Sequence, residues 1–162
     1  MINQNRAPSR VDAGTLWAGG AAAGIVAALI VVVGILVCRG ILDIPILAPK
    51  GKGVWGDANT VTYALGAFLG ALVATGVIHL LILATPRPTM FFGWIMTLAT
   101  AAAIFAPFAV KASTESRVST AVINFLTGLA IGTLVAASAR SAVRKAAFAA
   151  RPPVVPPTYR TR

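Results

Sequence analysis

Residues 15–38 read TLWAGGAAAGIVAALIVVVGILVC, a stretch that contains no charged side chain. About 20 helical residues, each rising 1.5 Å, cross a hydrocarbon core of about 30 Å. Backbone polar groups in lipid must be bonded within the protein, so a continuous apolar run of this length predicts a membrane-spanning helix. The run is too long for the apolar region of a cleaved signal peptide, about 7–15 residues, so we expect the helix to be retained.

Three further uncharged stretches, 61–84, 90–110 and 118–139, have the same character. Of the 162 residues, 57% are hydrophobic and 11% are charged, whereas a soluble domain carries about 25% charged residues. This composition argues against a soluble domain, and a single cysteine excludes a disulfide framework. We predict an all-α fold, a transmembrane four-helix bundle over 15–139, with an N-terminal segment 1–14, an outer loop 39–60 and a tail 140–162.

The basic residues predict how the chain is threaded. Four spans place both termini on one side, together with the turn that holds Arg87, and this side carries nine of the fourteen lysine and arginine residues. The positive-inside rule therefore predicts cytoplasmic N- and C-termini, in a plasma membrane protein. Six of the fourteen lie in the tail 140–162, where anionic lipids are the expected partner. No nucleic-acid-binding fold accompanies the net charge of +10, so we expect no nucleic-acid partner.

Small residues recur at every fourth position in three of the spans. In lipid, helices associate by close van der Waals approach, which small residues permit. Packing inside one bundle is one interpretation of this pattern, and contact with a second copy or with another membrane protein is the other. The glycines concerned are Gly20 and Gly24, Gly66 and Gly70, and Gly128 and Gly132.

Two polar residues inside the spans form a candidate intramembrane site. His79 is the one histidine of the chain, and an ionisable residue at membrane depth is a functional-site hypothesis by default. The alternative is a neutral imidazole hydrogen-bonded to a helix backbone or to a nearby threonine. Asn124 suits either an interhelical hydrogen bond or a polar pathway. Pro107 lacks an N–H group, so we expect a kink near the end of the third span.

The segments outside the spans carry weaker signals. Pro45 and Pro49 interrupt the first part of the outer loop, which we expect to lie on the membrane surface or to fold over the helix ends. The part 50–57 is expected to be flexible, and Asp57 or Asn59 to cap the second helix. The alanine-rich start of the tail is expected either to continue the fourth helix into the cytoplasm or to bend along the membrane interface. The prolines of 152–157 favour an extended spacer or a recognition segment.

The sequence contains no arrangement of residues typical of an enzyme. It lacks a serine–histidine–acid set, paired carboxylates within the spans and a cluster with metal-ligand spacing. We therefore predict no catalytic residues, no cofactor and no metal, and a protein that is not an enzyme.

Trp17 in the first span, the proline-bearing loop and the glycine-rich second span resemble the small uncharacterised four-pass membrane proteins of Gram-positive bacteria. The resemblance covers residues 15 to about 140, and that group implies no activity and no site residues. Small multidrug transporters share the size, but they carry an essential glutamate midway along the first helix. Residues 24–33 contain no acid, which argues against a proton-coupled exporter.

Two functional hypotheses follow. The first is a scaffold, accessory or assembly component that acts through helix–helix contacts. The alternative is a small oligomeric transporter or channel whose path is lined by His79 and Asn124. A polar file across both leaflets would favour transport, and the scattered polar positions of this chain favour the first hypothesis.

The predicted threading is tested by labelling introduced cysteines. In a Cys38→Ser background, Lys50→Cys should react with an impermeant thiol reagent from outside the cell, and Thr158→Cys should react only after the membrane is opened. Labelling of both positions from the same side would contradict the four-span topology.

Overall fold

The structure is a computed structural model that describes residues 11–41, 46, 50–53, 56–58 and 60–151. Within these residues lie four long helices, α1 (Ala13–Gly40), α2 (Thr60–Ala84), α3 (Pro88–Phe105) and α4 (Thr114–Ala149), and a short 3₁₀ helix, η1 (Ala106–Ala109). Each long helix, with η1 continuing α3, is long and apolar enough to cross a membrane. The predicted all-α four-helix architecture is confirmed, and the chain is a multi-pass membrane protein.

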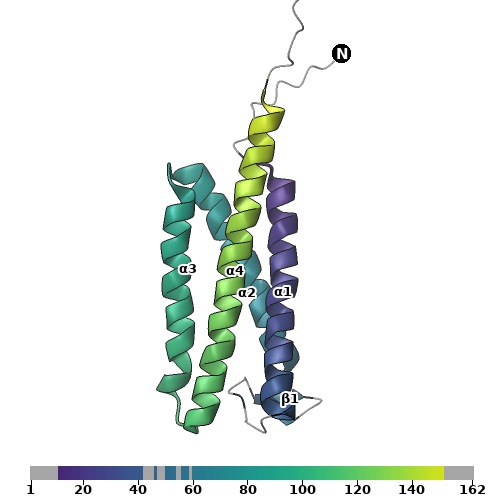
Figure 1. The fold of residues 1–162 in the computed structure, drawn as a ribbon, viewed down its shortest axis with the longest axis vertical. Coiled ribbons are helices and arrows are strands. Elements are labelled where there is room, and N and C mark those ends of the chain that lie inside the picture. The colour runs from purple at the N-terminus through teal and green to yellow at the C-terminus, as the bar shows by residue number, and fades with distance from the viewer. Residues whose placement is uncertain (1–10, 42–45, 47–49, 54–55, 59, 152–162) are drawn as a thin grey trace, which may run out of the picture.

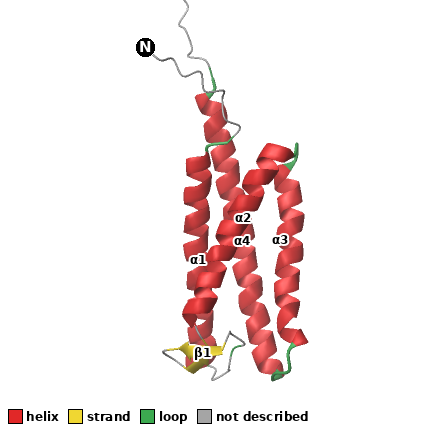
Figure 2. Ribbon diagram, turned by 180° about the vertical axis from the view of Figure 1, so that it is seen from behind, coloured by secondary structure: helices red, strands yellow, loops and turns green. Residues whose placement is uncertain are grey.

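The helices run up and down between two ends of the bundle (Figure 1). At one end, the terminal end, α1 begins, α4 ends and a short turn joins α2 to α3. At the other, the loop end, α1 ends, α2 and α4 begin and η1 follows α3. Both views show α2 crossing the bundle obliquely, so that it lies near α3 at the terminal end and beside α1 at the loop end (Figures 1 and 2).

The buried core lies mainly where α1 meets α2 and α4. Leu16, Ile78 and Val135 are fully buried there, one from each of these helices. In α3, all of which the structure describes, Phe92 is the one buried residue. Large apolar side chains such as Leu98, 66% exposed, cover the outside of the bundle. In a membrane these side chains face lipid. Their exposure has little cost there, because lipid tails are as apolar as the protein interior.

The loop end shows how the backbone is satisfied around Pro107. Because proline has no N–H, the carbonyl of Ala103, four residues earlier, lacks its helical donor. The Asn124 side chain of α4 donates Nδ2 to this carbonyl oxygen at 2.7 Å. Helix α3 ends at Phe105 and the chain continues as the 3₁₀ turn η1. The change of helix type occurs next to Pro107, where the sequence predicts a kink.

The helices are longer than the predicted spans. Helix α4 begins at Thr114, where the Ser113 side chain accepts from the Ser116 N–H, and it continues ten residues past Ala139 to Ala149. The expected extension of the fourth helix is therefore confirmed. Hydrocarbon thickness limits a span, whereas a helix ends only where backbone hydrogen bonding or capping ends it, so the two boundaries differ.

The described part of the outer loop contains two short strands that the sequence analysis did not predict. They are β1 (Lys50–Gly53) and β2 (Gly56–Ala58), which form an antiparallel pair. Ile46 is buried against Val31, Ile35 and Ile123, so the loop at this residue folds over the helix ends. Other expectations fall outside the described residues: the positions of Pro45 and Pro49, the capping side chains of Asp57 and Asn59, and the proline-rich segment 152–157.

At the terminal end, α1 is fastened to the extension of α4. The Asp12 N–H donates to the Ala142 carbonyl at 3.2 Å, and the Asp12 carboxylate forms an ion pair with Lys145 at 3.1 Å. Asp12 also caps α1 by accepting from the Thr15 N–H at 2.7 Å. The Thr15 N–H, the Thr15 hydroxyl and the Lys145 ammonium together hold the pKa of the Asp12 carboxyl below its ordinary value of 3.8.

This junction should weaken in acid. A lowered carboxyl pKa means that the stabilisation is complete above pH 3.8 and is lost as the pH falls through the lowered value. In the full chain in micelles, the Thr15 amide proton shift, followed by NMR, should titrate with a midpoint below 3.8. Lys145→Gln should move that midpoint upward, and Arg144→Gln should not. A wild-type midpoint at or above the ordinary value would contradict the assignment.

Candidate functional site

The glycines predicted to pack helices fall into two groups. On α1, a Cβ atom at Gly20 would lie 2.7 Å from Cγ2 of Thr75, and one at Gly24 would lie 2.7 Å from Cδ2 of Phe68, both on α2. On α4, a Cβ at Gly128 would lie 2.6 Å from Cγ2 of Thr100 on α3. These contacts are closer than any side chain tolerates, so the helix pairs can approach only because glycine stands there.

Gly132 and the α2 pair differ from this pattern. A Cβ at Gly132 would meet Met96 at an ordinary 3.6 Å. At Gly66 and Gly70, no atom of the described residues lies within 4 Å of an added Cβ. The pattern of small residues is therefore used inside the bundle on α1 and α4, and it is left open on α2.

The open α2 face borders a groove of about 400 Å³ between α2 and α3, with α4 at its floor. Gly66 and Gly70 line it from α2, and Ile95 and Ala99 line it from α3. At its floor the Thr127 side chain is 9% exposed, and within the described part of the chain its hydroxyl oxygen has no hydrogen-bond partner. Tyr63, Thr100 and Asn124 also line this groove, and the rest of its lining is apolar.

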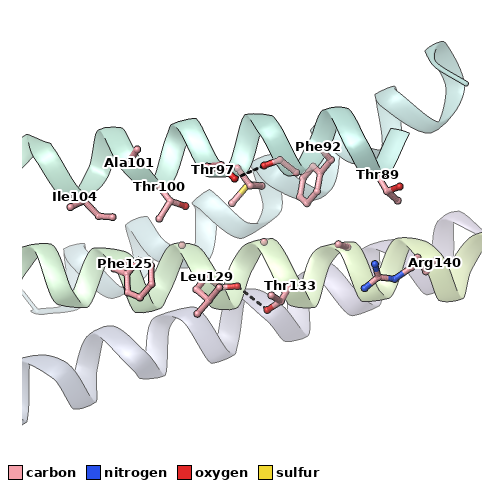
Figure 3. Close-up of a pocket in the computed structure, with 15 residues that line it drawn as sticks. Thr89, Phe92, Thr97, Thr100, Ala101, Ile104, Phe125, Leu129, Thr133 and Arg140 are labelled. Carbon is pink, nitrogen blue, oxygen red and sulfur yellow. Dashed lines mark hydrogen bonds between the residues drawn. The ribbon is translucent and has the colours of Figure 1, made fainter. Parts of the chain in front are cut away.

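A second groove, of about 560 Å³, lies between α3 and α4. Figure 3 shows it running from Thr89 and Arg140 at one end to Ile104 and Phe125 at the other. Thr97 and Thr133 point their hydroxyls back to helix carbonyls, at 2.9 and 2.8 Å. The middle of this groove therefore offers a largely apolar surface, and its charged group, Arg140, stands at the terminal end.

His79 and Asn124 lie in different parts of the bundle. The imidazole Nδ1 of His79 accepts a hydrogen bond from the Trp17 indole N–H at 3.3 Å. The sequence analysis suggested a backbone group or a threonine as the partner, and the structure shows a tryptophan in that role. Asn124 accepts from the Tyr63 hydroxyl as well as donating to Ala103. Tyr63 and His79 are sixteen residues apart on α2, about 24 Å along the helix axis at 1.5 Å per residue.

Sequence reasoning missed several residues of these contacts. Gly19 packs against Ser138, where an added Cβ would lie 2.5 Å from the Ser138 Cβ. Gly34 packs against Ile123, where an added Cβ would lie 2.8 Å from the Ile123 Cγ1. The pair Gly19–Gly20 offered a signal for the first, whereas the isolated Gly34 offered none. In the described residues, no group of three or more histidine, cysteine, aspartate or glutamate side chains is close enough to share a metal ion.

A family model described as a family of unknown function (DUF6069) matches residues 11–141. No curated protein and no solved structure matches the chain. The match covers α1, α2 and α3 completely and α4 as far as Ser141, whereas α4 itself continues to Ala149.

The two kinds of glycine should respond oppositely to a methyl group. Gly20→Ala places a Cβ against Thr75 and should destabilise the fold by about 1–3 kcal/mol, the usual range for overpacking. In a single subunit, Gly66→Ala meets open space, so in a detergent that keeps the chain monomeric it should leave the stability unchanged or raise it by about 0.5–1 kcal/mol through helix propensity. Thermal unfolding of the two variants in one detergent measures the difference. Equal destabilisation would contradict the packing described here.

Proposed function

The chain belongs to the family of unknown function DUF6069, and from this premise we propose that it is a non-catalytic membrane component that assembles through helix–helix contacts on its α2 face. The observation that carries the proposal is the difference between the glycine pairs. Those of α1 and α4 pack within the bundle, whereas Gly66 and Gly70 meet no described atom within 4 Å. A helix face with this spacing of glycines allows a second helix to approach closely in lipid.

The partner that we propose is a second copy of the chain. A twofold contact places the same surface on both copies, so the glycine stripe of one α2 would face that of the other. Leu65, Leu69 and Val73 flank the stripe and are 54%, 50% and 67% exposed. They supply side chains that can pack on either side of the close approach. The groove of 400 Å³ is too small to hold a helix, so the partner helix would pack over it.

The placement of the polar residues supports assembly over transport. His79 is engaged with Trp17 on α1, and Asn124 is engaged with Tyr63 and the Ala103 carbonyl. Asn124 thereby satisfies a backbone group that Pro107 leaves without a donor. A transport path requires polar groups that follow one another across both leaflets, and these two sets are about 24 Å apart along α2.

The proposal includes an orientation in the plasma membrane. Arg87, Arg140, Arg144, Lys145 and Arg151 all belong to the terminal end. Basic residues next to span ends favour the cytoplasmic side, so we place both termini in the cytoplasm. The resemblance to proteins of Gram-positive bacteria stays an expectation about the source of the chain.

Counting subunits in liposomes tests the assembly. The full chain, labelled with one fluorophore and diluted in lipid, should bleach in two steps. A variant with Gly66→Leu and Gly70→Leu should bleach in one step, because the leucines keep the two backbones apart. Gly93→Leu, a similarly open glycine on α3, is the control and should retain two steps.

Two results would count against this function. A wild-type chain that is a single subunit and co-purifies with no other membrane protein would contradict assembly. Solute or ion flux through the reconstituted protein, absent from empty liposomes, would favour the transporter or channel.

A further inference from the structure

The groove between α3 and α4 points to a ligand that the assembly role does not require. We propose that it binds an anionic phospholipid from the leaflet at the terminal end, with an acyl chain along the groove and the phosphate at Arg140 and Arg144. Neither Gly66 nor Gly70 lines this groove, so the proposal does not depend on contact between the α2 faces of two copies.

The length and width of the groove suit an acyl chain. Its lining on α4 runs from Phe125 to Arg140, fifteen residues or about 22 Å at 1.5 Å per residue. That exceeds one leaflet's half of a hydrocarbon core of about 30 Å. A helix of about 10 Å diameter and this length would occupy roughly 1,700 Å³, about three times the groove's 560 Å³. A single hydrocarbon chain is therefore the better fit.

A second cavity borders the charged end of the groove. This cavity, of about 540 Å³, shares Thr89 and Arg140 with the groove and adds Arg144 and Ser141. Arg144 donates to the Ser141 hydroxyl at 3.4 Å, which leaves most of its guanidinium donors available. Both arginines are exposed at the end of the bundle, where a phosphate of the adjacent leaflet would lie.

The charge at this end is not neutralised within the described residues. Asp12, the nearby carboxylate of the terminal end, is paired with Lys145 at 3.1 Å. No ion pair joins Arg140 or Arg144 to a carboxylate in the described part of the chain. A guanidinium presents a planar set of donors that matches the oxygens of a phosphate. The two arginines therefore favour an anionic headgroup over a zwitterionic one.

The combination of features selects a lipid over other anions. Free phosphate would use the two arginines and leave the apolar groove empty, whereas a phospholipid fills both. The groove between α2 and α3 is apolar as well, but none of its lining residues is charged. Of these two grooves, the one between α3 and α4 combines an apolar channel with a charged residue, Arg140, at its end.

Native mass spectrometry of the full chain tests the proposal. Protein from micelles with equal phosphatidylglycerol and phosphatidylcholine should retain phosphatidylglycerol preferentially. A variant with Arg140→Gln and Arg144→Gln should lose this preference by about fivefold per arginine, about 25-fold for both, from the usual contribution of a basic residue at an anionic surface. Arg87→Gln with Arg151→Gln removes the same charge outside both cavities and should keep the preference.

A groove-filling variant separates the acyl chain from the headgroup. Thr133 is exposed in the groove, and Thr133→Phe should expel the bound lipid although both arginines remain. Circular dichroism and thermal unfolding of each variant confirm that it is folded. An unchanged preference in the Arg140 and Arg144 variant would overturn the proposal. So would an equal loss in the charge-matched control, lipid retention by Thr133→Phe, or displacement of the lipid by inorganic phosphate at equal concentration.

Discussion

Every backbone N–H and carbonyl that lies in a hydrocarbon layer must find its partner within the protein, and this constraint accounts for the architecture. Helices meet it along almost their whole length. Pro107, near the end of the third span, leaves the Ala103 carbonyl without a donor, and the Asn124 side chain of the neighbouring helix supplies one at 2.7 Å. Asn124 is thus placed where the backbone needs a polar group, and a catalytic or transport role is not required to explain it.

Once the helices exist, close approach decides how they are arranged. Lipid is as apolar as leucine, so burying an aliphatic side chain against another helix gains little. The tight contacts are therefore made at glycine, where Gly20 meets Thr75 and Gly128 meets Thr100. Helix α3 makes few such contacts and buries only Phe92 of its described residues. The two grooves, and both proposals, follow from this looser packing of α3.

Charge is confined to the ends of the bundle and acts differently at each position. Lys145 is used within the fold, because it fastens Asp12 and Thr15 of α1 to the extension of α4. Arg140, one helical turn and a residue earlier, faces the groove mouth instead. Two basic residues close together on α4 therefore have different roles: Lys145 makes a structural contact, and Arg140 forms part of an exposed cationic surface.

The number of helices, their all-α character, the irregularity at Pro107 and the extension of the fourth helix were predictable from the sequence. Each depends on local information: the length of an apolar run, a missing N–H, or helix propensity. The sequence could not distinguish the packed glycines from Gly66 and Gly70, and it did not identify Trp17 as the partner of His79. Those outcomes depend on how each helix is rotated and crossed. In a membrane protein the inward and outward faces are equally apolar, so hydropathy carries no signal for rotation, and only the tertiary structure decides it.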